Sequence, residues 1–145
     1  MPTRTAHTTW TGGLQDGTGT VTLVSSGLGS YEISFPKRAA EDADGTTSPE
    51  ELIAAAHAGC FAMQFSALLG AAGGSSQSLD VDANVTLGPD PAGGFRITGI
   101  KLTVSGSAAG VSPEDFAKIA TDAKANCPVS KALAGTTITL DVMAG

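Results

Sequence analysis

Two cysteines, Cys60 and Cys127, are the residues of this sequence best suited to redox chemistry, and it contains no others. Cys60 lies in the segment TSPEELIAAAHAGCF (residues 47–61), and Cys127 lies in ANCPVSKAL (residues 125–133). Two interpretations are open at this point. Either both residues are small hydrophobic members of a core, or they form a redox pair that folding brings together.

The surroundings of Cys60, considered alone, favour an unreactive role. The residue lies ten positions after Glu50, within an apolar segment that is expected to form a dry helix. Burial among apolar groups disfavours the thiolate and raises the pKa of a thiol. To act as a nucleophile, Cys60 would therefore need a fixed cation close to its sulfur.

Arg38 is the candidate for that cation. The chain has eight Lys and Arg residues, and Arg38 follows a predicted strand and precedes the helix that carries Cys60. A guanidinium stays charged when it is desolvated, and it can hydrogen-bond a thiolate and a peroxide oxygen together. Glu50 could hold this guanidinium through a bidentate ion pair. The alternative is that Arg38 and Glu50 are solvated charges beside a helix cap.

Cys127 precedes Pro128, and proline is common at the first position of a helix. A cysteine at a helix start faces unpaired backbone N–H groups, which favour its thiolate. The alternative is a small cap residue without reactivity. His57 lies three residues before Cys60, and we expect it to be a buried histidine with satisfied hydrogen bonds rather than a catalytic base.

The composition limits the classes of location and partner. The 145 residues fit a single domain over 1–145, and a formal net charge of −6 disfavours nucleic acid and anionic membranes as partners. Residues 52–72 approach membrane-spanning length but contain His57, Gln64 and many Ala and Gly residues, so we expect a buried helix and no membrane. The first residues lack an apolar signal-peptide region, which favours a cytoplasmic location. No cysteine or histidine spacing indicates a metal site, and no cofactor is expected.

The pattern of apolar residues predicts two strands, a buried helix, two further strands, two helices and a final strand. Residues 37–48 are polar and predict a loop. Because strands and helices are segregated along the chain rather than alternating strictly, the expected fold class is α+β. The strands are predicted at 18–26, 31–35, 79–87, 95–106 and 136–142.

The helices are predicted from their start signals. Ser48 and Glu51 suit a capping box, and the helix that follows is expected to run to Leu69. Its apolar residues cover nearly every face, which predicts burial all round, inside a domain or at a subunit interface. A second, amphipathic helix is predicted after Ser112, and a third is predicted to begin at Pro128.

These segments together resemble the osmotically inducible protein C (OsmC) family and the related organic hydroperoxide resistance (Ohr) proteins. The resemblance rests on TSPEELIAAAHAGCF, with FPKR upstream and NCPVSKAL and TITLDV downstream, and it covers nearly the whole chain. The FPKR segment makes it nearer to the OsmC branch. The resemblance implies antiparallel sheets packed around a buried central helix, in an intertwined homodimer with active sites at the subunit interface.

The resemblance also implies a function, that of a thiol-dependent peroxidase. The matching positions make Cys60 the residue that attacks the peroxide and Cys127 the residue that resolves the resulting sulfenic acid. They make Arg38 and Glu50 the arginine and the glutamate of the active site. The implied reductant is an external dithiol, with lipoylated proteins as the usual donors in the Ohr branch.

The expected substrate is an organic hydroperoxide rather than hydrogen peroxide, in defence against oxidative or osmotic stress. This expectation rests on apolar walls around the thiol, for which Phe61, Met63 and Phe65 are the candidates. Two alternatives stay open. The same cysteines could form a non-catalytic redox sensor, or the chain could be a structural or ligand-binding domain with inert thiols.

Overall fold

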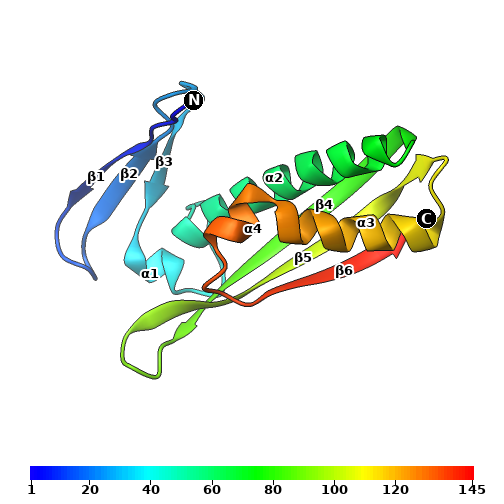
Figure 1. Ribbon diagram of the computed structural model, residues 1–145. Helices are drawn as coiled ribbons and strands as arrows, with labels where there is room; N and C mark the ends of the chain where they lie inside the picture. Colours follow the sequence, from blue (N-terminus) through cyan, green and yellow to red (C-terminus); the bar gives the residue numbers. More distant parts are fainter. The chain divides into compact units, whose positions relative to one another are not determined.

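The computed structural model describes residues 1–145, which form two compact units, Met1–Leu52 and Ile53–Gly145 (Figure 1). Each unit contains one three-stranded sheet. The boundary between the units falls in the first turn of the long helix α2 (Pro49–Ala71). Strands and helices are segregated along the chain, so the α+β class predicted from the sequence is confirmed.

The first unit is built on an antiparallel sheet in which each strand pairs with its neighbour along the chain. Its strands are β1 (His7–Thr11), β2 (Thr18–Thr22) and β3 (Ser30–Ile33), in the order β1-β2-β3. The sequence analysis missed β1, because both faces of this strand are exposed and its sequence lacks apolar alternation. Val21 of β2 is the one buried hydrophobic residue of this unit.

A short helix, α1 (Phe35–Arg38), follows β3 where the sequence analysis placed a strand end and a loop. Ser34 has an extended backbone, and its hydroxyl accepts a hydrogen bond from the Lys37 N–H at 3.3 Å. This side-chain cap satisfies a donor that the first turn would otherwise leave free. The predicted strand therefore ends at Ile33, and the predicted loop over 37–48 is wrong at its start.

Helix α2 begins at the predicted cap. The Ser48 hydroxyl accepts a hydrogen bond from the Glu51 N–H at 3.1 Å. In a complete capping box the Glu51 carboxylate would accept a hydrogen bond from the Ser48 backbone N–H. Here it accepts one from the Thr47 hydroxyl at 2.6 Å instead. The helix ends slightly beyond its predicted limit, where Gly73 takes a φ of 86° that only glycine adopts easily.

One face of α2 is buried. The buried residues of this face recur at four-residue spacing and are His57, Phe61, Phe65 and Leu69. Other faces are open, and Met63 is 71% exposed. Burial all round inside one domain is therefore wrong, and burial of the other faces at a subunit interface stays a prediction. By length and composition α2 could cross a membrane, a test that core helices of soluble proteins also pass.

The second unit is built on a mixed sheet in the order β4-β5-β6. Strands β4 (Ser75–Pro89) and β5 (Phe95–Ala109) form a long antiparallel hairpin. Strand β6 (Ile138–Ala144) pairs with β5 in parallel. This pairing corrects the expectation of purely antiparallel sheets. A parallel neighbour requires a long crossover connection, which two helices supply here.

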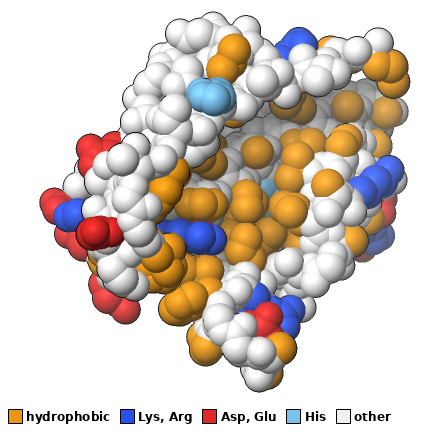
Figure 2. Space-filling model, turned by 90° about the vertical axis from the view of Figure 1, so that its left-hand side faces the viewer, with side chains coloured by type: hydrophobic (Ala, Val, Ile, Leu, Met, Phe, Trp, Pro, Cys, Tyr) orange, Lys and Arg blue, Asp and Glu red, His pale blue; other side chains and the backbone are white.

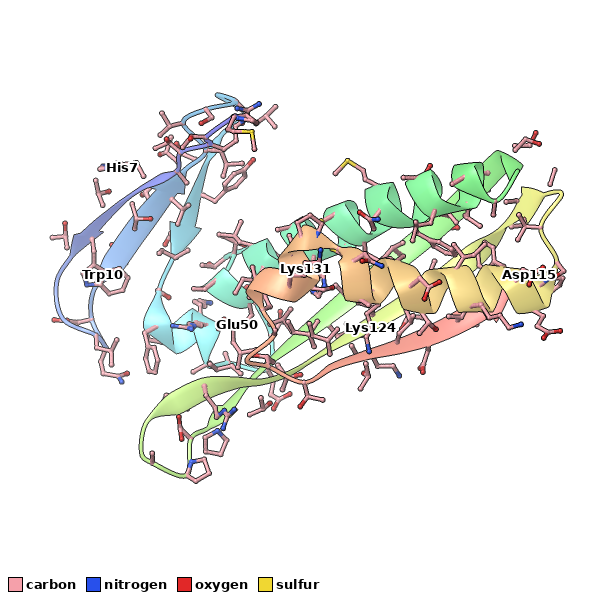
Figure 3. The ribbon with its side chains drawn as sticks, viewed as in Figure 1. His7, Trp10, Glu50, Asp115, Lys124 and Lys131 are labelled. Carbon is pink, nitrogen blue, oxygen red and sulfur yellow. The ribbon has the colours of Figure 1, made fainter.

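The crossover helices are α3 (Pro113–Asn126) and α4 (Pro128–Ala132), both close to their predicted starts. Ser112 caps α3 by accepting a hydrogen bond from the Asp115 N–H at 3.1 Å. Lys124 of α3, labelled in Figure 3, donates its ammonium to the backbone carbonyl of Ile138 at 3.0 Å. This bond ties the crossover to the strand that follows it.

The core of the second unit joins the helices to one face of the sheet. Phe65 of α2 lies between two other aromatic rings, with ring centroids 5.6 Å from Phe61 and 4.8 Å from Phe116 of α3. Tilted and edge contacts of this kind stabilise a core beyond the area that they bury. The sheet contributes Leu102 and Val104 of β5, which are fully buried. Cys127 is a member of this cluster, and Cys60 is partly buried and packed against it.

Candidate active site

The structure brings the two cysteines together. Cys60 lies on α2 beside the buried face of that helix, and Cys127 lies between α3 and α4, where its N–H donates to the Ala123 carbonyl at 2.9 Å. Both residues have free thiols, and their Sγ atoms are 3.0 Å apart and share a hydrogen bond. Residues 67 positions apart in the chain are therefore in position to exchange a proton or to form a disulfide.

The two sulfurs differ in their access to solvent. Cys127 is fully buried, whereas Cys60 is partly exposed. A small molecule that approaches this pair from solvent therefore meets Cys60 first.

The two sulfurs also differ in acidity. Burial raises the pKa of Cys60, and the neighbouring sulfur of Cys127 raises it further, against one backbone hydrogen bond from Val129. Burial also acts to raise the pKa of Cys127, but hydrogen bonds from Cys60, Ser130 and Val129 outweigh it and lower that pKa below its ordinary value. Within the second unit, these contacts favour the thiolate of Cys127 over that of Cys60.

The start of α4 contributes to this acidity. The backbone N–H groups of Val129 and Ser130 belong to the first turn of this five-residue helix, and they lower the pKa of Cys127. This agrees with the expectation that backbone N–H groups at a helix start favour the Cys127 thiolate.

In the first unit, Arg38 and Glu50 form a bidentate ion pair, as the sequence analysis expected. The Arg38 Nε donates to both carboxylate oxygens at 3.1 Å, and its Nη2 donates to Oε1 at 2.7 Å. Figure 3 places Glu50 at the start of α2, and this residue is buried. Arg38 ends α1, so the short helix and the first turn of α2 together fix the guanidinium. A fork held in this way has a defined orientation.

An apolar pocket of about 220 Å³ adjoins this guanidinium within the first unit. Its hydrophobic walls come from β1, from the turn that follows it, and from the end of β3 with α1. The lining residues are Trp10, Leu14, Ile33, Ser34, Phe35, Arg38 and Pro49. The pocket thus combines an apolar interior with one fixed cation, an arrangement suited to a molecule that has an organic part and a polar or anionic end.

The predicted apolar walls from α2 have other roles. Phe61 and Phe65 are fully buried in the core of the second unit, and Met63 faces away from it and is mostly exposed. The expectation that Phe61 and Phe65 line a substrate pocket is wrong, because the four-residue periodicity of α2 turns the two phenylalanines toward the sheet. The expectation for Met63 stays a prediction.

Sequence reasoning missed Ser130. This residue is buried on α4, and its hydroxyl lies 2.7 Å from His57 Nε2 on α2. His57 is buried as expected, but its Nδ1 has no hydrogen-bond partner, so it is only half satisfied. Burial lowers the pKa of His57 and keeps the ring neutral. The only sequence signal was that Ser130 belongs to the same CPVS segment as Cys127.

The residues described contain no group of three or more His, Cys, Asp or Glu side chains placed to hold a metal ion.

The chain belongs to the family described as OsmC-like protein, whose model matches residues 41–142. Proteins of this class match along nearly the whole chain. The chain is 42% identical, over 132 residues, to Peroxiredoxin OsmC of Escherichia coli (strain K12), and the match covers 91% of this chain and 90% of that protein.

Solved structures agree with this assignment. The organic hydroperoxide resistance protein OhrB of Bacillus subtilis is 27% identical with a TM-score of 0.71, and the match covers 96% of this chain and 98% of that one. An organic hydroperoxide resistance protein from Elizabethkingia anophelis is 28% identical with a TM-score of 0.71, covering 97% and 96% of the two chains. The family suggested by the sequence motifs is thereby confirmed.

Proposed function

We propose that this chain is a thiol-dependent peroxidase that reduces organic hydroperoxides with Cys60 as the attacking residue and Cys127 as the resolving residue. The observation that carries the proposal is the 3.0 Å contact between a partly exposed and a fully buried thiol. That the chain is a cysteine-based peroxidase also follows from its likeness to a peroxiredoxin and to hydroperoxide resistance proteins.

The reaction has three steps. The Cys60 thiolate attacks the distal oxygen of the hydroperoxide, the O–O bond breaks, and the alcohol leaves with a proton while Cys60 becomes a sulfenic acid. The Cys127 thiolate then attacks the Cys60 sulfur, and hydroxide leaves as water after protonation, giving a disulfide. A dithiol reduces this disulfide in two exchanges and is itself oxidised to a cyclic disulfide. Lipoylated proteins are the dithiol donors that we propose.

Arg38 has the role of making Cys60 nucleophilic in this scheme. The environment of the second unit raises the pKa of Cys60 by burial, so its thiolate needs a cation from elsewhere in the protein. Arg38 is fixed by Glu50 and can donate to a thiolate and to a peroxide oxygen. Glu50 holds the guanidinium in orientation and takes no proton itself.

The preference for organic hydroperoxides follows from the pocket beside Arg38. Its hydrophobic lining, which includes Trp10, Leu14 and Phe35, suits an alkyl or aryl group. Hydrogen peroxide has no such group and gains nothing from this surface, so we expect it to be a weaker substrate.

A homodimer is part of the proposal. Hydrophobic side chains reach the surface of each unit (Figure 2). Leu14 and Leu28 of the first unit and Met63 of the second are each more than half exposed in a single chain. Exposed apolar surface of this extent is typical of an interface. A second copy of the chain is the partner that we propose, with residues 1–145 of each copy acting as one functional domain in the cytoplasm.

The test is peroxide consumption by the reduced protein with cumene hydroperoxide and excess dithiol, beside Cys60→Ser and Cys127→Ser. We expect repeated turnover by the unchanged protein, none by Cys60→Ser, and rapid inactivation of Cys127→Ser through over-oxidation of Cys60. Consumption of a single equivalent would indicate a redox sensor instead. Thiols that react only after denaturation would indicate an inert domain.

A further inference from the structure

The indole of Trp10 is fixed on the sheet of the first unit. Trp10 lies on β1 and is labelled in Figure 3. Its Nε1–H donates a hydrogen bond to the Gly12 carbonyl at 3.0 Å, while 42% of the side chain stays exposed. The ring therefore has a defined orientation and keeps a free surface. The scheme above uses it only as one of several apolar walls.

Two glycines leave the space that the indole occupies. Trp10 is paired with Gly19 across β1 and β2, and Gly17 lies two residues earlier, on the same face as Gly19. Both glycines are buried. A Cβ atom at Gly17 would lie 2.8 Å from Cζ2 of the indole, and one at Gly19 would lie 2.8 Å from its Cε3. Carbon atoms in ordinary contact are at least about 3.5 Å apart, so the ring lies across a surface that only glycine provides.

The same surface brings Trp10 to the pocket beside Arg38. Gly19 is also paired with Ile33 of β3, and a Cβ at Gly19 would lie 3.2 Å from Ile33 Cγ1. Trp10 and Ile33 thus flank Gly19 on the two neighbouring strands, and both line the pocket. Gly17 and Gly19 are not among the lining residues. They support this wall without contacting what the pocket holds.

A fixed indole at the pocket wall distinguishes one class of organic group from another. An aryl ring gains from stacking or edge contact with the indole beyond the area that it buries, whereas an alkyl group gains from the buried area alone. The cavity of about 220 Å³ is smaller than the roughly 300–1,000 Å³ of pockets for drug-sized ligands, so it suits a single small ring. Because the indole is already fixed, little side-chain entropy is lost when a ligand contacts it.

We propose that Trp10 makes this pocket select aryl hydroperoxides over alkyl hydroperoxides, and that Gly17 and Gly19 are positioning residues for its indole. The proposal rests on the proposed peroxidase function and names the substrate class within it. The aryl ring of the substrate lies on the indole, and its peroxide end lies at the guanidinium of Arg38, which lines the same pocket. Trp10 contacts only the organic part of the substrate and takes no part in breaking the O–O bond.

Binding is tested without turnover. Trp10 is the only tryptophan of the chain, so tryptophan emission reports on this pocket alone. The reduced full-length protein is titrated with 2-phenyl-2-propanol, the alcohol that cumene hydroperoxide leaves on reduction, and with tert-butanol. We expect a saturable change in emission with the aryl alcohol and none with tert-butanol. Equal changes that rise linearly with both alcohols would overturn the proposal.

Kinetics test the selectivity. Trp10→Leu should lower the ratio of kcat/KM for cumene hydroperoxide to that for tert-butyl hydroperoxide by about three- to tenfold, and Trp10→Phe should retain most of it. A change that merely weakened the fold would lower both kcat/KM values and leave their ratio unchanged. Tyr31→Leu is the matched control, because Tyr31 is an aromatic residue of β3 that is 41% exposed and lies outside the pocket lining. An unchanged ratio in Trp10→Leu would contradict the proposal.

The role of the glycines is tested from outside the pocket. Gly19→Ala places a methyl group where the indole lies, so it should shift the tryptophan emission and lower the same ratio. Gly135→Ala places a methyl group in open space and should change neither. Circular dichroism checks that both variants fold, and the Trp10 variants test the selectivity independently of them. Unchanged emission and an unchanged ratio in folded Gly19→Ala would refute the positioning role.

The outcomes separate this proposal from the proposed function. Turnover of both hydroperoxides with an unchanged ratio in Trp10→Leu would refute the aryl selectivity alone. Absence of turnover together with saturable binding of 2-phenyl-2-propanol would refute the peroxidase and leave the aryl site standing.

Discussion

The two units position their reactive groups in different ways. The first unit holds Arg38 by a bidentate ion pair with Glu50, and it buries a single hydrophobic side chain, Val21. The second unit holds Cys60 and Cys127 against a cluster of ten buried residues, in which Cys127 itself is included. A guanidinium keeps its charge in any environment, so short contacts are enough to place it. The pKa of a thiol changes with burial and with nearby hydrogen-bond donors, so the acidity of the pair depends on the packing of the core around it.

This difference has a consequence for stability. A unit of about fifty residues with one buried apolar side chain gains little from hydrophobic burial and depends on support from other surfaces. The second unit has its own core. Substitutions can therefore distinguish the two units. Changes in the core of the second unit should mainly affect the free energy of unfolding, and changes at Arg38 in the first unit should mainly affect activity.

The largest effect is expected in the second unit. Phe65→Ala removes a ring packed between two others and should lower the free energy of unfolding by about 3–5 kcal/mol. Val21→Ala, the matched change in the first unit, should cost only about 1 kcal/mol. Urea denaturation of both variants would measure this. Equal losses in the free energy of unfolding would mean that the two units do not differ in how much their cores stabilise them.

Arg38→Met should lower kcat/KM for cumene hydroperoxide by about a hundredfold or more, because a fixed cation is lost from the transition state. It should also lower the free energy of unfolding by about 1–3 kcal/mol, because the buried Glu50 carboxylate loses its partner. Arg38→Lys should recover only part of this loss, since an ammonium cannot form the same fork. Steady-state kinetics with matched circular dichroism spectra would measure both. If Arg38→Met lowered kcat/KM by only about twofold, the guanidinium would have no important role in the reaction.

Glu50→Gln should have a smaller effect, lowering kcat/KM by about tenfold. The guanidinium remains but loses the charged partner that orients it. Because Glu50 is proposed only to position Arg38, the double variant Arg38→Met/Glu50→Gln should be no worse than Arg38→Met alone. Additive losses in the double variant would give Glu50 an independent role.

The smallest effect concerns pH. The pKa of His57 is lowered in the folded protein by burial, whereas an unfolded histidine has a pKa of about 6.5. As the pH falls below about 6.5, the unfolded chain binds a proton that the folded protein does not, so the free energy of unfolding decreases. The slope from this one group is at most about 1.4 kcal/mol per pH unit, until the pH reaches the lower folded pKa.

His57→Gln should flatten this pH dependence, whatever its effect on stability at neutral pH. Urea denaturation of both proteins at about pH 7.5 and about pH 5.5 would measure the difference in slope. An identical slope in the variant would show that another group carries the proton linkage.

Local signals predicted much of the fold. The caps at Ser48 and Ser112 placed two helices correctly, because side-chain hydrogen bonds at a helix start involve only neighbours. The alternation along β4 and β5 identified the long hairpin, although both strands extend beyond their predicted ends. The cap at Ser34 was missed because a four-residue helix has no periodicity to recognise.

Features that depend on distant residues were less accessible. The Arg38–Glu50 pair spans 12 positions and could be suggested from residue types alone. The His57–Ser130 hydrogen bond could not, because a buried serine on a five-residue helix carries no distinguishing pattern. The parallel pairing of β6 was also out of reach, since an alternating strand looks the same whichever way it runs.

That parallel strand has a consequence for the order in which the protein is assembled. The hairpin of β4 and β5 can close as soon as both strands have been synthesised, because their contacts are close in sequence. Strand β6 comes after α3 and α4 in the chain, and it reaches its place beside β5 only through this crossover. The segment that carries Cys127 is therefore secured later than the hairpin, when β6 joins the sheet. We expect a chain that has closed the hairpin but not yet added β6 to lack the reactive thiol pair.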